Sequence, residues 1–450
     1  MKIIILDDDP TGSQTVYDST LILDCSFTNI KNALLSDYKL IFLLINTRSM
    51  SESNTELKLR EISKYFKRIF DSNIYQSNQV IFVSRGDSTL RGHGYLEPRI
   101  LGEELGPFNA TFYIPAFIEG GRTTVNGVHY LNKIPVHETI FAKDSNFGYT
   151  TSVIKDWLEF KSKGQILADN VLHISIKFLE TAINSKHGFK DLIDFMNALD
   201  RNVSVVVDAE DSKHLYVFGK AIRSLHPHKR FLFRSAASFI NGLISLPNNP
   251  YDIEDLVSTR RKNSEGRILP GMIVIGSYVK LSDDQLEVLL SDQSCKGVEL
   301  PVQKIAEVFL GLIPESELVD LKYLCVKNIE IILDSFKTPV LYTSRLEIVT
   351  SNSIDKNLEF GFFVAEFLAS IVKEFKFSIG YVISKGGNST QVLLSNGLDL
   401  STVILKGQIL PGLSLVIGEI NNIKLPIITF PGNLGDKYTL IKAWRIMENK

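Results

Sequence analysis

The chain has 450 residues, of which 44% are hydrophobic and 22% charged, values typical of a globular protein with two or three domains. Its formal net charge of −2 argues against a nucleic-acid or membrane-surface partner, and no apolar run approaches the roughly 18 to 20 residues that a spanning helix needs. The three cysteines are widely separated and lack metal-ligand spacing, which predicts a reduced, cytoplasmic protein.

The first half of the chain alternates short apolar runs with longer stretches that suit helices, such as 52–70 and 190–199. This alternation predicts βαβ units, and therefore an α/β fold with a mostly parallel sheet flanked by helices. The predicted strands are 3–6, 21–23, 40–45, 80–83, 111–114, 171–174 and 203–207.

Residues 236–270 differ in character and are predicted to link two domains, 1–235 and 271–450. The segment contains Pro247 and Pro250, the basic run 260–262, and a Pro-Gly pair at its end. Beyond it, the apolar spacing over 360–375 predicts a helix with one face in the core. The strands predicted for this second half are 272–275, 340–342, 381–383, 403–405 and 427–430.

The loop after the first predicted strand is unusually acidic. Asp7, Asp8 and Asp9 close the strand, Pro10 forces a turn, and Gly12 permits a tight backbone. Three consecutive acids repel one another, and a simple turn would not need them. Adjacent carboxylates at a strand end can accept hydrogen bonds from substrate hydroxyls or bind Mg²⁺, so Asp8 and Asp9 are candidate site residues.

The loop after the fourth predicted strand is the most specific signal in the chain. It places Asp87, Ser88, Thr89 and Arg91 together. Arg91 suits a bidentate pair with a substrate carboxylate. Asp87 is the preferred candidate for the base that accepts the proton of an attacking hydroxyl, with Asp9 as second choice.

Two further stretches of the first half add cations to this set. Arg48 follows a predicted buried strand, and Gly121-Arg122 combines flexible backbone with another arginine. We therefore include Arg48, Gly121 and Arg122, with Ser88, among the predicted substrate-binding residues.

Three glycine loops follow strands of the second half. Gly276-Ser277 ends one strand and precedes Ser282–Gln285, which has the pattern of a helix N-cap. The segments 384–390 and 431–435 are again strand ends followed by glycine turns. They lack the full Walker spacing, so they form no P-loop. Backbone N–H groups that no side chain shields suit a phosphate, and the three loops together predict a nucleotide site.

At these residues the chain resembles the four-carbon acid sugar kinase family. The family's Asp-Ser-Thr-Leu-Arg-Gly signature stands intact at 87–92, and the matching pieces cover essentially the whole chain in the family's order. The other matching pieces are Asp8-Asp9 with Thr11-Gly12, Gly121-Arg122, Gly276-Ser277, Gly386-Gly387 and Pro431-Gly432-Asn433.

The resemblance implies ATP-dependent phosphorylation of threonate, erythronate or their 3-oxo forms, with Mg²⁺ offsetting charge on the transferring group. It also implies a substrate-binding N-terminal domain, a nucleotide-binding C-terminal domain, and an active site in the interdomain cleft. The implied substrate contacts are Asp8, Asp9, Arg48, Asp87 and Arg91, and the implied ATP contacts are Ser277, Gly386, Gly387, Asn388, Ser389 and Gly432.

The chain departs from the family at two positions of its glycine loops. Asn388 stands where an acid is usual, and Pro431 replaces a serine. These departures suggest a divergent subgroup whose substrate need not have four carbons. The sequence names neither the sugar acid nor the hydroxyl that is phosphorylated, and it leaves homo-oligomerisation open.

Two other functions remain open at this stage. Asp7-x-Asp9-x-Thr11 after an apolar run also fits the nucleophile motif of haloacid-dehalogenase-like phosphatases. Asp7 would then attack phosphorus, Asp9 would be the general acid, and Asp208 with Asp211 could complete a Mg²⁺ site. The second alternative is a sugar-acid sensor that has lost turnover, which the departure at Asn388 would permit.

Overall fold

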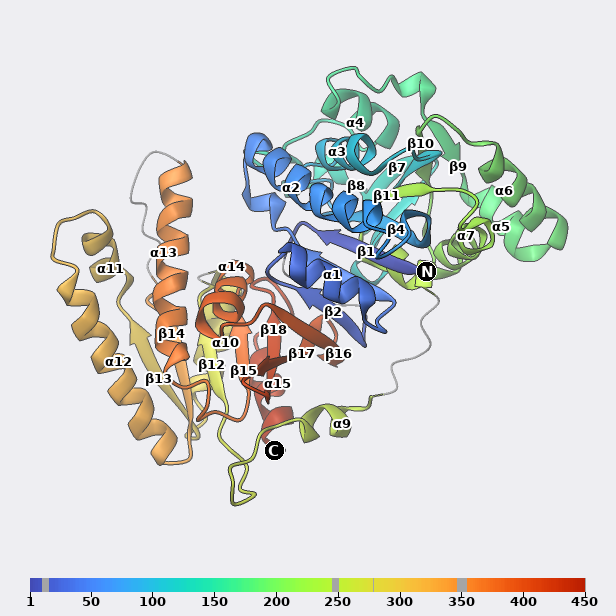
Figure 1. The fold of residues 1–450 in the computed structure, drawn as a ribbon. Coiled ribbons are helices and arrows are strands. Elements are labelled where there is room, and N and C mark those ends of the chain that lie inside the picture. The colour runs from blue at the N-terminus through green and yellow to red at the C-terminus, as the bar shows by residue number, and fades with distance from the viewer. Residues whose placement is uncertain (10–15, 245–250, 278, 346–353, 450) are drawn as a thin grey trace. The chain divides into compact units, whose positions relative to one another are not determined.

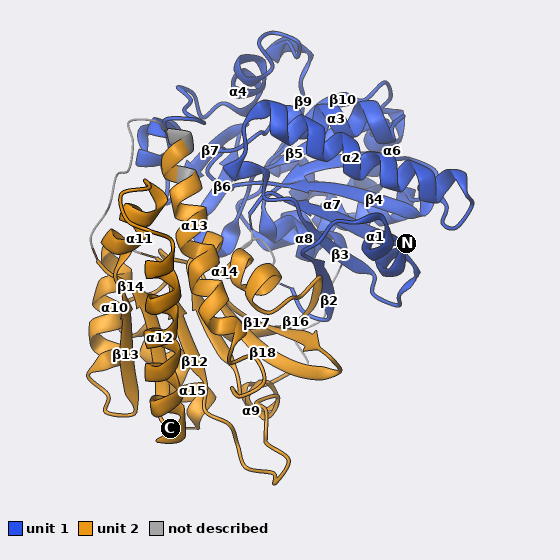
Figure 2. Ribbon diagram, turned by 60° about the vertical axis from the view of Figure 1, so that its left-hand side comes forward, with its two compact units in different colours: residues 1–248 blue, residues 249–450 orange. Residues whose placement is uncertain are grey.

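The computed structural model describes residues 1–9, 16–244, 251–277, 279–345 and 354–449. The chain divides into two compact units, residues 1–248 and 249–450 (Figure 2). Among the predicted features, Pro10, Thr11, Gly12 and the prolines at 247 and 250 lie outside the described residues.

The first unit is built on a parallel sheet with helices on both faces (Figure 1). Each strand predicted for this half lies in or overlaps an observed strand, so the predicted α/β class is confirmed. The strands, in spatial order, are β2 (Ser19–Ile22), β3 (Leu40–Leu44), β1 (Lys2–Asp7), β4 (Val80–Arg85), β11 (Phe231–Ser235), β5 (Ala110–Ile114), β10 (Val203–Val207) and β9 (Leu172–Ile174).

Apolar side chains hold helices against both faces of this sheet. On one face, α1 (Phe27–Leu35), α2 (Glu52–Asp71) and α3 (Leu96–Leu105) bury their apolar residues against β1, β3 and β4. On the other, Phe112 of β5 packs edge-on against Phe218 of α7 (Ser212–Leu225), and Phe233 of β11 contacts Phe239 of α8 (Ala237–Ile244). The sheet is therefore covered on both faces, as a parallel sheet requires.

Shorter elements of the first unit follow β5 in the chain. A small antiparallel sheet contains β6 (Arg122–Val125), β7 (Val128–Leu131) and β8 (Ile134–Pro135), and Thr124 of β6 pairs with Ala209, just after β10. Three helices come next, α4 (Ile154–Lys161), α5 (Ile176–Asn184) and α6 (Lys186–Ala198).

The second unit has a mixed sheet. The neighbouring strands β13, β14, β12, β15 and β18 run parallel to one another. β17 pairs with β18 in the antiparallel direction, and β16 pairs with β17 in the same way. The spatial order is β13 (Cys295–Leu300), β14 (Thr338–Thr343), β12 (Met272–Ile275), β15 (Val382–Lys385), β18 (Ile423–Phe430), β17 (Leu413–Ile420) and β16 (Thr402–Leu410).

One core of the second unit lies under α9 (Ile253–Ser258), α10 (Lys280–Leu290) and α15 (Thr439–Glu448), where Trp444 is fully buried. The helices α11 (Val302–Phe309), α12 (Ser316–Asp334) and α13 (Ile354–Lys373) pack on one another, and α13 contacts α14 (Gly387–Val392). Most of the apolar stripe predicted for 360–375 is buried, with Ile371 and Val372 fully covered, whereas Phe363 and Phe367 are half-buried. Within the described residues, no helix combines the length and apolar composition that crossing a bilayer requires.

Two local predictions need correction. The segment 236–270 is not simply a linker, because α8 packs on α7 in the first unit and the apolar residues of α9 join the core of the second. The helix predicted to be capped at Ser282 begins earlier, at Lys280. Ser282 is fully buried in the first turn, where its hydroxyl bonds to the Oγ of Ser277 at 2.9 Å.

Candidate functional site

The loops predicted to bind substrate converge at one edge of the first sheet. β1 ends at Asp7, β4 at Arg85 and β11 at Ser235, and the parallel register aligns Asp7 with Arg85 and Arg85 with Ser235. Loops at the carboxyl ends of neighbouring parallel strands share one rim, where such sheets bind ligands.

Arg48 binds the two predicted carboxylates at this rim. Its guanidinium donates to Asp8 at 2.7 and 3.3 Å, and to Oδ2 of Asp9 at 3.1 Å. Asp8 is fully buried, whereas the Arg48 side chain is 20% exposed. Arg48 therefore offsets part of the negative charge of the two carboxylates and fixes their orientation.

Asp7 lies behind this pair and is nearly inaccessible. Nη1 of Arg85 lies 3.3 Å from its Oδ1. Burial raises the pKa of Asp7 to about 7, against the opposing charge of Arg85. The first loop thus carries an interior carboxyl that titrates near neutrality, and two carboxylates held by Arg48.

Asp87 and Arg91 form the second half of the cluster. Nε of Arg91 donates to Oδ2 of Asp87 at 2.7 Å, and the Thr89 hydroxyl donates to the same oxygen. Burial alone would raise the pKa of Asp87, but the charges of Arg48 and Arg91 and these hydrogen bonds hold it well below its usual range. Asp87 is therefore an ionised hydrogen-bond acceptor at every pH where the protein would work.

The 87–92 loop is fixed by buried groups of the segment that follows β5. His129 of β7 bonds to the Ser88 carbonyl at 2.7 Å, and the Tyr149 hydroxyl donates to the Thr89 carbonyl at 2.6 Å. Burial lowers the pKa of His129 to about 4, so the ring is neutral and acts as a structural donor. Gly92, the last residue of the signature, has φ +89°, and a Cβ there would stand 3.0 Å from Asp8 Oδ2.

Arg234, at the end of β11, is a site residue that the sequence predictions missed. It is buried, donates to Glu97 Oε2 at 2.6 Å and to Ser84 Oγ at 2.7 Å, and lies 3.8 Å from Asp8 Oδ2. Its guanidinium passes so close to Gly86 that a Cβ there would stand 2.1 Å from Nη2. The available signal was an apolar run, Phe231 to Phe233, followed by an arginine at a strand end.

Gly121 and Arg122 are placed differently from each other. Gly121 makes a left-handed turn with φ +72°, where a Cβ would collide with the side chain of Asn132. The guanidinium carbon of Arg122 lies 5.8 Å from the centroid of the Phe117 ring, and burial lowers the pKa of Arg122 while the charge of Asp87 opposes that shift. Arg122 thus belongs electrostatically to the Asp87 cluster, whereas Gly121 shapes the turn before it.

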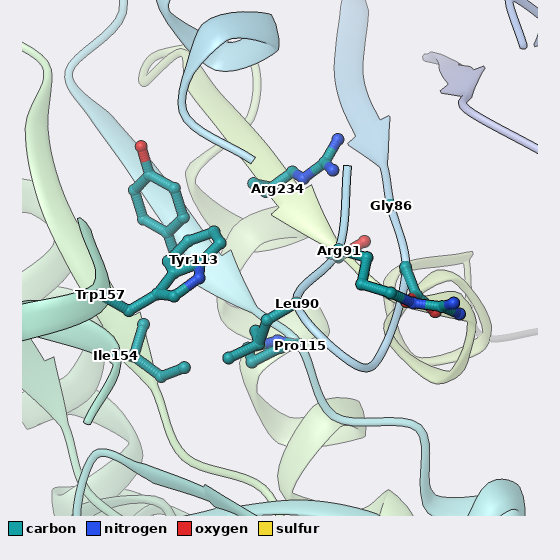
Figure 3. A pocket seen from close by; sticks show the side chains of 10 residues that line it. Gly86, Leu90, Arg91, Tyr113, Pro115, Ile154, Trp157 and Arg234 are labelled. Carbon is teal, nitrogen blue, oxygen red and sulfur yellow. The ribbon is translucent and has the colours of Figure 1, made fainter. Parts of the chain in front are cut away.

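A small pocket opens beside Asp87 and Arg91 (Figure 3). Tyr113, Trp157 and Ile154 lie on one side of it in this view, and the side chain of Arg91 lies on the other. The site therefore presents an apolar wall next to its charged groups. The lining residues are Gly86, Asp87, Leu90, Arg91, Tyr113, Pro115, Ile154, Trp157, Arg234 and Ser235.

The three glycine loops of the second unit also come together. Gly276 packs so closely on Ser389 that a Cβ there would stand 2.0 Å from Oγ. Gly432 approaches Ser277 in the same way, at 2.8 Å from Oγ. Gly386 adopts φ +120°, and a Cβ on it would come within 3.3 Å of the Ser277 nitrogen. The predicted nucleotide contacts Ser277, Gly386, Gly387, Asn388, Ser389 and Gly432 thus form one set of adjoining loops.

Two residues that contact these loops, Lys385 and Arg345, were not among the predicted nucleotide contacts. Lys385, the last residue of β15, donates to the carbonyls of Pro431 and Gly432. Arg345 donates to the Ser277 carbonyl at 2.8 Å and pairs with Asp283 at 3.1 Å.

The phosphatase alternative does not fit this arrangement. Asp208 directly follows β10, which is four strands from β1 in the sheet, or about 19 Å at the usual strand spacing. Its carboxylate accepts the backbone N–H groups of Asn126 and Gly127 at 2.8 and 2.9 Å, and Asp211 caps α7. The proposed acidic pair therefore cannot share a Mg²⁺ with Asp7. Within the described residues, no cluster of three or more His, Cys, Asp or Glu suits a metal ion.

Comparison with known proteins matches the two parts of the chain to two different family models. Residues 3–243 match the family model of a sugar-binding N-terminal domain, and residues 272–440 match that of a nucleotide-binding C-terminal domain. The chain belongs to the four-carbon acid sugar kinase family. A relative from Heliobacterium modesticaldum, named D-erythronate kinase, is 22% identical over 301 residues. The match covers 64% of this chain and 60% of that protein.

Solved structures share the fold of this family member. A Haemophilus influenzae protein superposes with a TM-score of 0.65, and a protein from Salmonella typhimurium LT2 with 0.70. Each is 15% identical, and each match covers 99% of both chains. At this identity the likeness concerns the fold alone.

Proposed function

We propose that the chain is an ATP-dependent kinase that phosphorylates a hydroxyl of a small sugar acid such as erythronate or threonate. The observation that carries the proposal is the cluster of Asp8, Asp9, Arg48, Asp87 and Arg91 at one rim of the first unit's sheet. It offers acceptors for several hydroxyls next to a cation suited to a carboxylate. The relative named D-erythronate kinase supports the same substrate class.

The side chains of the first unit have distinct roles in this proposal. Arg91, with its side chain 28% exposed, pairs with the substrate carboxylate. Asp9, fixed by Arg48 and with its side chain 24% exposed, accepts hydrogen bonds from the substrate hydroxyls, while the fully buried Asp8 holds Arg48 in place. The apolar wall of Tyr113, Trp157 and Ile154 excludes water beside the reacting group.

Asp87 holds the hydroxyl that is phosphorylated. Its low pKa makes it a weak base in the free protein. Phosphoryl transfer passes through a loose transition state, in which orienting the attacking oxygen matters more than early proton removal. Asp87 accordingly positions the hydroxyl and accepts its proton late in the step.

The glycine loops of the second unit suit ATP. Gly276, Gly386 and Gly432 let the three loops approach closely around Ser277 and Ser389, whose backbone N–H and hydroxyl groups can donate hydrogen bonds to phosphate oxygens. Bound ATP would supply the phosphoryl group, and Mg²⁺ held by its phosphates would offset negative charge in transfer. The amide of Asn388 adds a neutral donor where a family acid would add negative charge.

The test is ADP release from MgATP in the presence of four- to six-carbon sugar acids and their 3-oxo forms. The proposal expects release that depends on one class of acid, with D-erythronate among the first to assay. Binding of ATP without release on any acid would favour the sensor and contradict the kinase.

A further inference from the structure

Lys385 is a fully buried amine among the glycine loops. It ends β15 and directly precedes Gly386. Its Nζ donates to the carbonyls of Pro431 at 3.2 Å and Gly432 at 3.0 Å, and lies 3.9 Å from the centroid of the Phe430 ring. These partners come from β18 and the loop that follows it, so the amine joins two of the three loops.

No carboxylate of the described residues pairs with this amine. The charged groups with described contacts on the neighbouring elements are engaged elsewhere. Arg345 pairs with Asp283 beside Ser277, and Asp436 bonds to Thr439. A buried ammonium without a counter-ion is unfavourable, and burial lowers the pKa of Lys385 to about 7. The loops therefore hold an amine that, within the described residues, has no carboxylate counter-ion for its positive charge.

Nucleotide phosphates at these loops would supply that partner. Gly432, whose carbonyl Lys385 binds, packs on Ser277, and Gly386 packs on the same serine. An anion at Ser277 and Gly386 would thus lie on the loops that Nζ joins, next to an amine that is itself buried. The two carbonyls that bind Nζ are directed at the amine, so they do not oppose a phosphate.

On the basis of the proposed function, we propose that Lys385 is the charge partner of the nucleotide phosphates and that nucleotide binding is coupled to proton uptake by its amine. The proton comes from solvent, and the phosphates stabilise the resulting ammonium through the loop. Lys385 would act as a positioning residue, through its field and through its bonds to the 431–432 carbonyls, without touching the reacting atoms.

The first test is calorimetric titration of the full chain with MgADP in buffers of different ionisation enthalpy. At about pH 8 the amine is mostly neutral before binding, so uptake of close to one proton is expected, and at about pH 6 uptake should fall toward zero. Binding without proton uptake at the higher pH would overturn the inference and leave the kinase proposal standing. Failure of MgADP to bind would overturn the nucleotide site, and with it the proposed function.

The second test replaces the amine. Lys385→Met should abolish the proton uptake and weaken MgADP binding on the order of 10- to 100-fold. Lys373→Met removes a lysine of the same unit that is 47% exposed and paired with Asp399, and should leave both unchanged. Unaltered MgADP affinity in Lys385→Met would contradict the inference. If that variant does not fold, the wild-type proton uptake still decides the question.

Discussion

Asp87 concentrates the chemistry of the first unit in a single carboxylate. It faces Arg91 and Thr89 and stays ionised because Arg48 and Arg91 outweigh the effect of its burial on its pKa. An amide of the same shape would keep the packing but lose the charge-assisted bonds and the proton acceptor.

Asp87→Asn should therefore lower turnover by at least about 100-fold, the usual contribution of a positioned proton acceptor. MgADP binding should stay unchanged, because the glycine loops belong to the other unit. Steady-state ADP release and nucleotide titration measure the two effects separately.

Asp211→Asn is the matched control for this change. Asp211 caps α7 through Lys213 N at 2.8 Å, and Asn caps a helix equally well. The control should retain full turnover. Turnover of Asp87→Asn within a few-fold of wild type would show that Asp87 does not hold the acceptor hydroxyl.

Lys385 gives a prediction for stability against pH. Its pKa is about 7 in the folded chain and 10.5 ordinarily, so the unfolded chain binds more protons between these values. The free energy of unfolding of the wild type therefore increases as the pH rises from about 7 to about 10.5. Below pH 7 the folded chain bears the full cost of burying the charged amine. Lys385→Met removes the penalty.

The melting temperature of Lys385→Met relative to wild type should consequently be higher at about pH 6 than at about pH 9. Thermal unfolding at both pH values measures this difference, with Lys373→Met expected to show the same offset at each. If the difference in melting temperature between Lys385→Met and wild type is the same at both pH values, burial does not lower the pKa of this amine.

At the scale of elements, one buried ion pair joins α3 to the sheet beneath the substrate site. Arg234 of β11 and Glu97 of α3 meet at 2.6 Å, and the Thr47 and Ser84 hydroxyls donate to the same carboxylate at 2.8 and 2.7 Å. Through Arg234 the network reaches Asp8. The orientation of Asp8 thus depends on helix α3 as well as on its own loop.

Arg234→Met should destabilise the chain by about 3 to 5 kcal/mol, because it leaves Glu97 buried without its cation. Denaturant unfolding measures the loss. Adding Glu97→Gln to Arg234→Met should recover part of the lost stability, because the buried carboxylate is then removed as well. If the stability losses of the two single variants simply add in the double variant, Arg234 and Glu97 are not coupled.

The glycine loops of the second unit depend on equally close contacts. Gly276→Ala would place a Cβ 2.0 Å from Ser389 Oγ and push apart the loops that hold Ser277. We expect a loss of about 1 to 3 kcal/mol in stability and weaker MgADP binding. Ser389→Gly in the same chain should restore stability, since it removes the atoms that collide. If the double variant is no more stable than Gly276→Ala alone, the collision with Ser389 is not the cause of the lost stability.

Most strands, and the loops at their carboxyl ends, could be predicted from the sequence because the patterns that mark them are local. An apolar run followed by Asp, Arg or Gly marks a parallel strand and the loop at its carboxyl end, as at Asp8, Asp87 and Gly386. β13 escaped prediction because Lys296 and Glu299 interrupt it at an exposed edge. The start of α10 was misplaced because Ser282 bonds to a neighbouring loop instead of capping the helix.

Long-range partners could not be predicted from local patterns. Arg234 reaches Glu97 across 137 residues only because β11 lies beside β4 in the sheet. Lys385 was visible in its loop, but its burial depends on Phe430 and the chain after β18. The role of such residues follows from strand order, which a single sequence does not state.

At the scale of the whole molecule, the chain contains two α/β units with different rims. The first rim carries paired carboxylates and arginines, and the second carries apposed glycine loops around a buried amine. This division agrees with the sugar-binding and nucleotide-binding models that match the two parts of the chain. A kinase needs both kinds of site, whereas a phosphatase of the alternative type would need neither the second rim nor ATP.

The most direct test of this account is phosphorus NMR of the product formed from MgATP and the sugar acid that supports ADP release. The account predicts a new phosphomonoester resonance that grows in step with ADP, and its loss in Asp87→Asn. ADP accompanied only by inorganic phosphate, or inorganic phosphate released from a phosphorylated sugar acid without ATP, would contradict it.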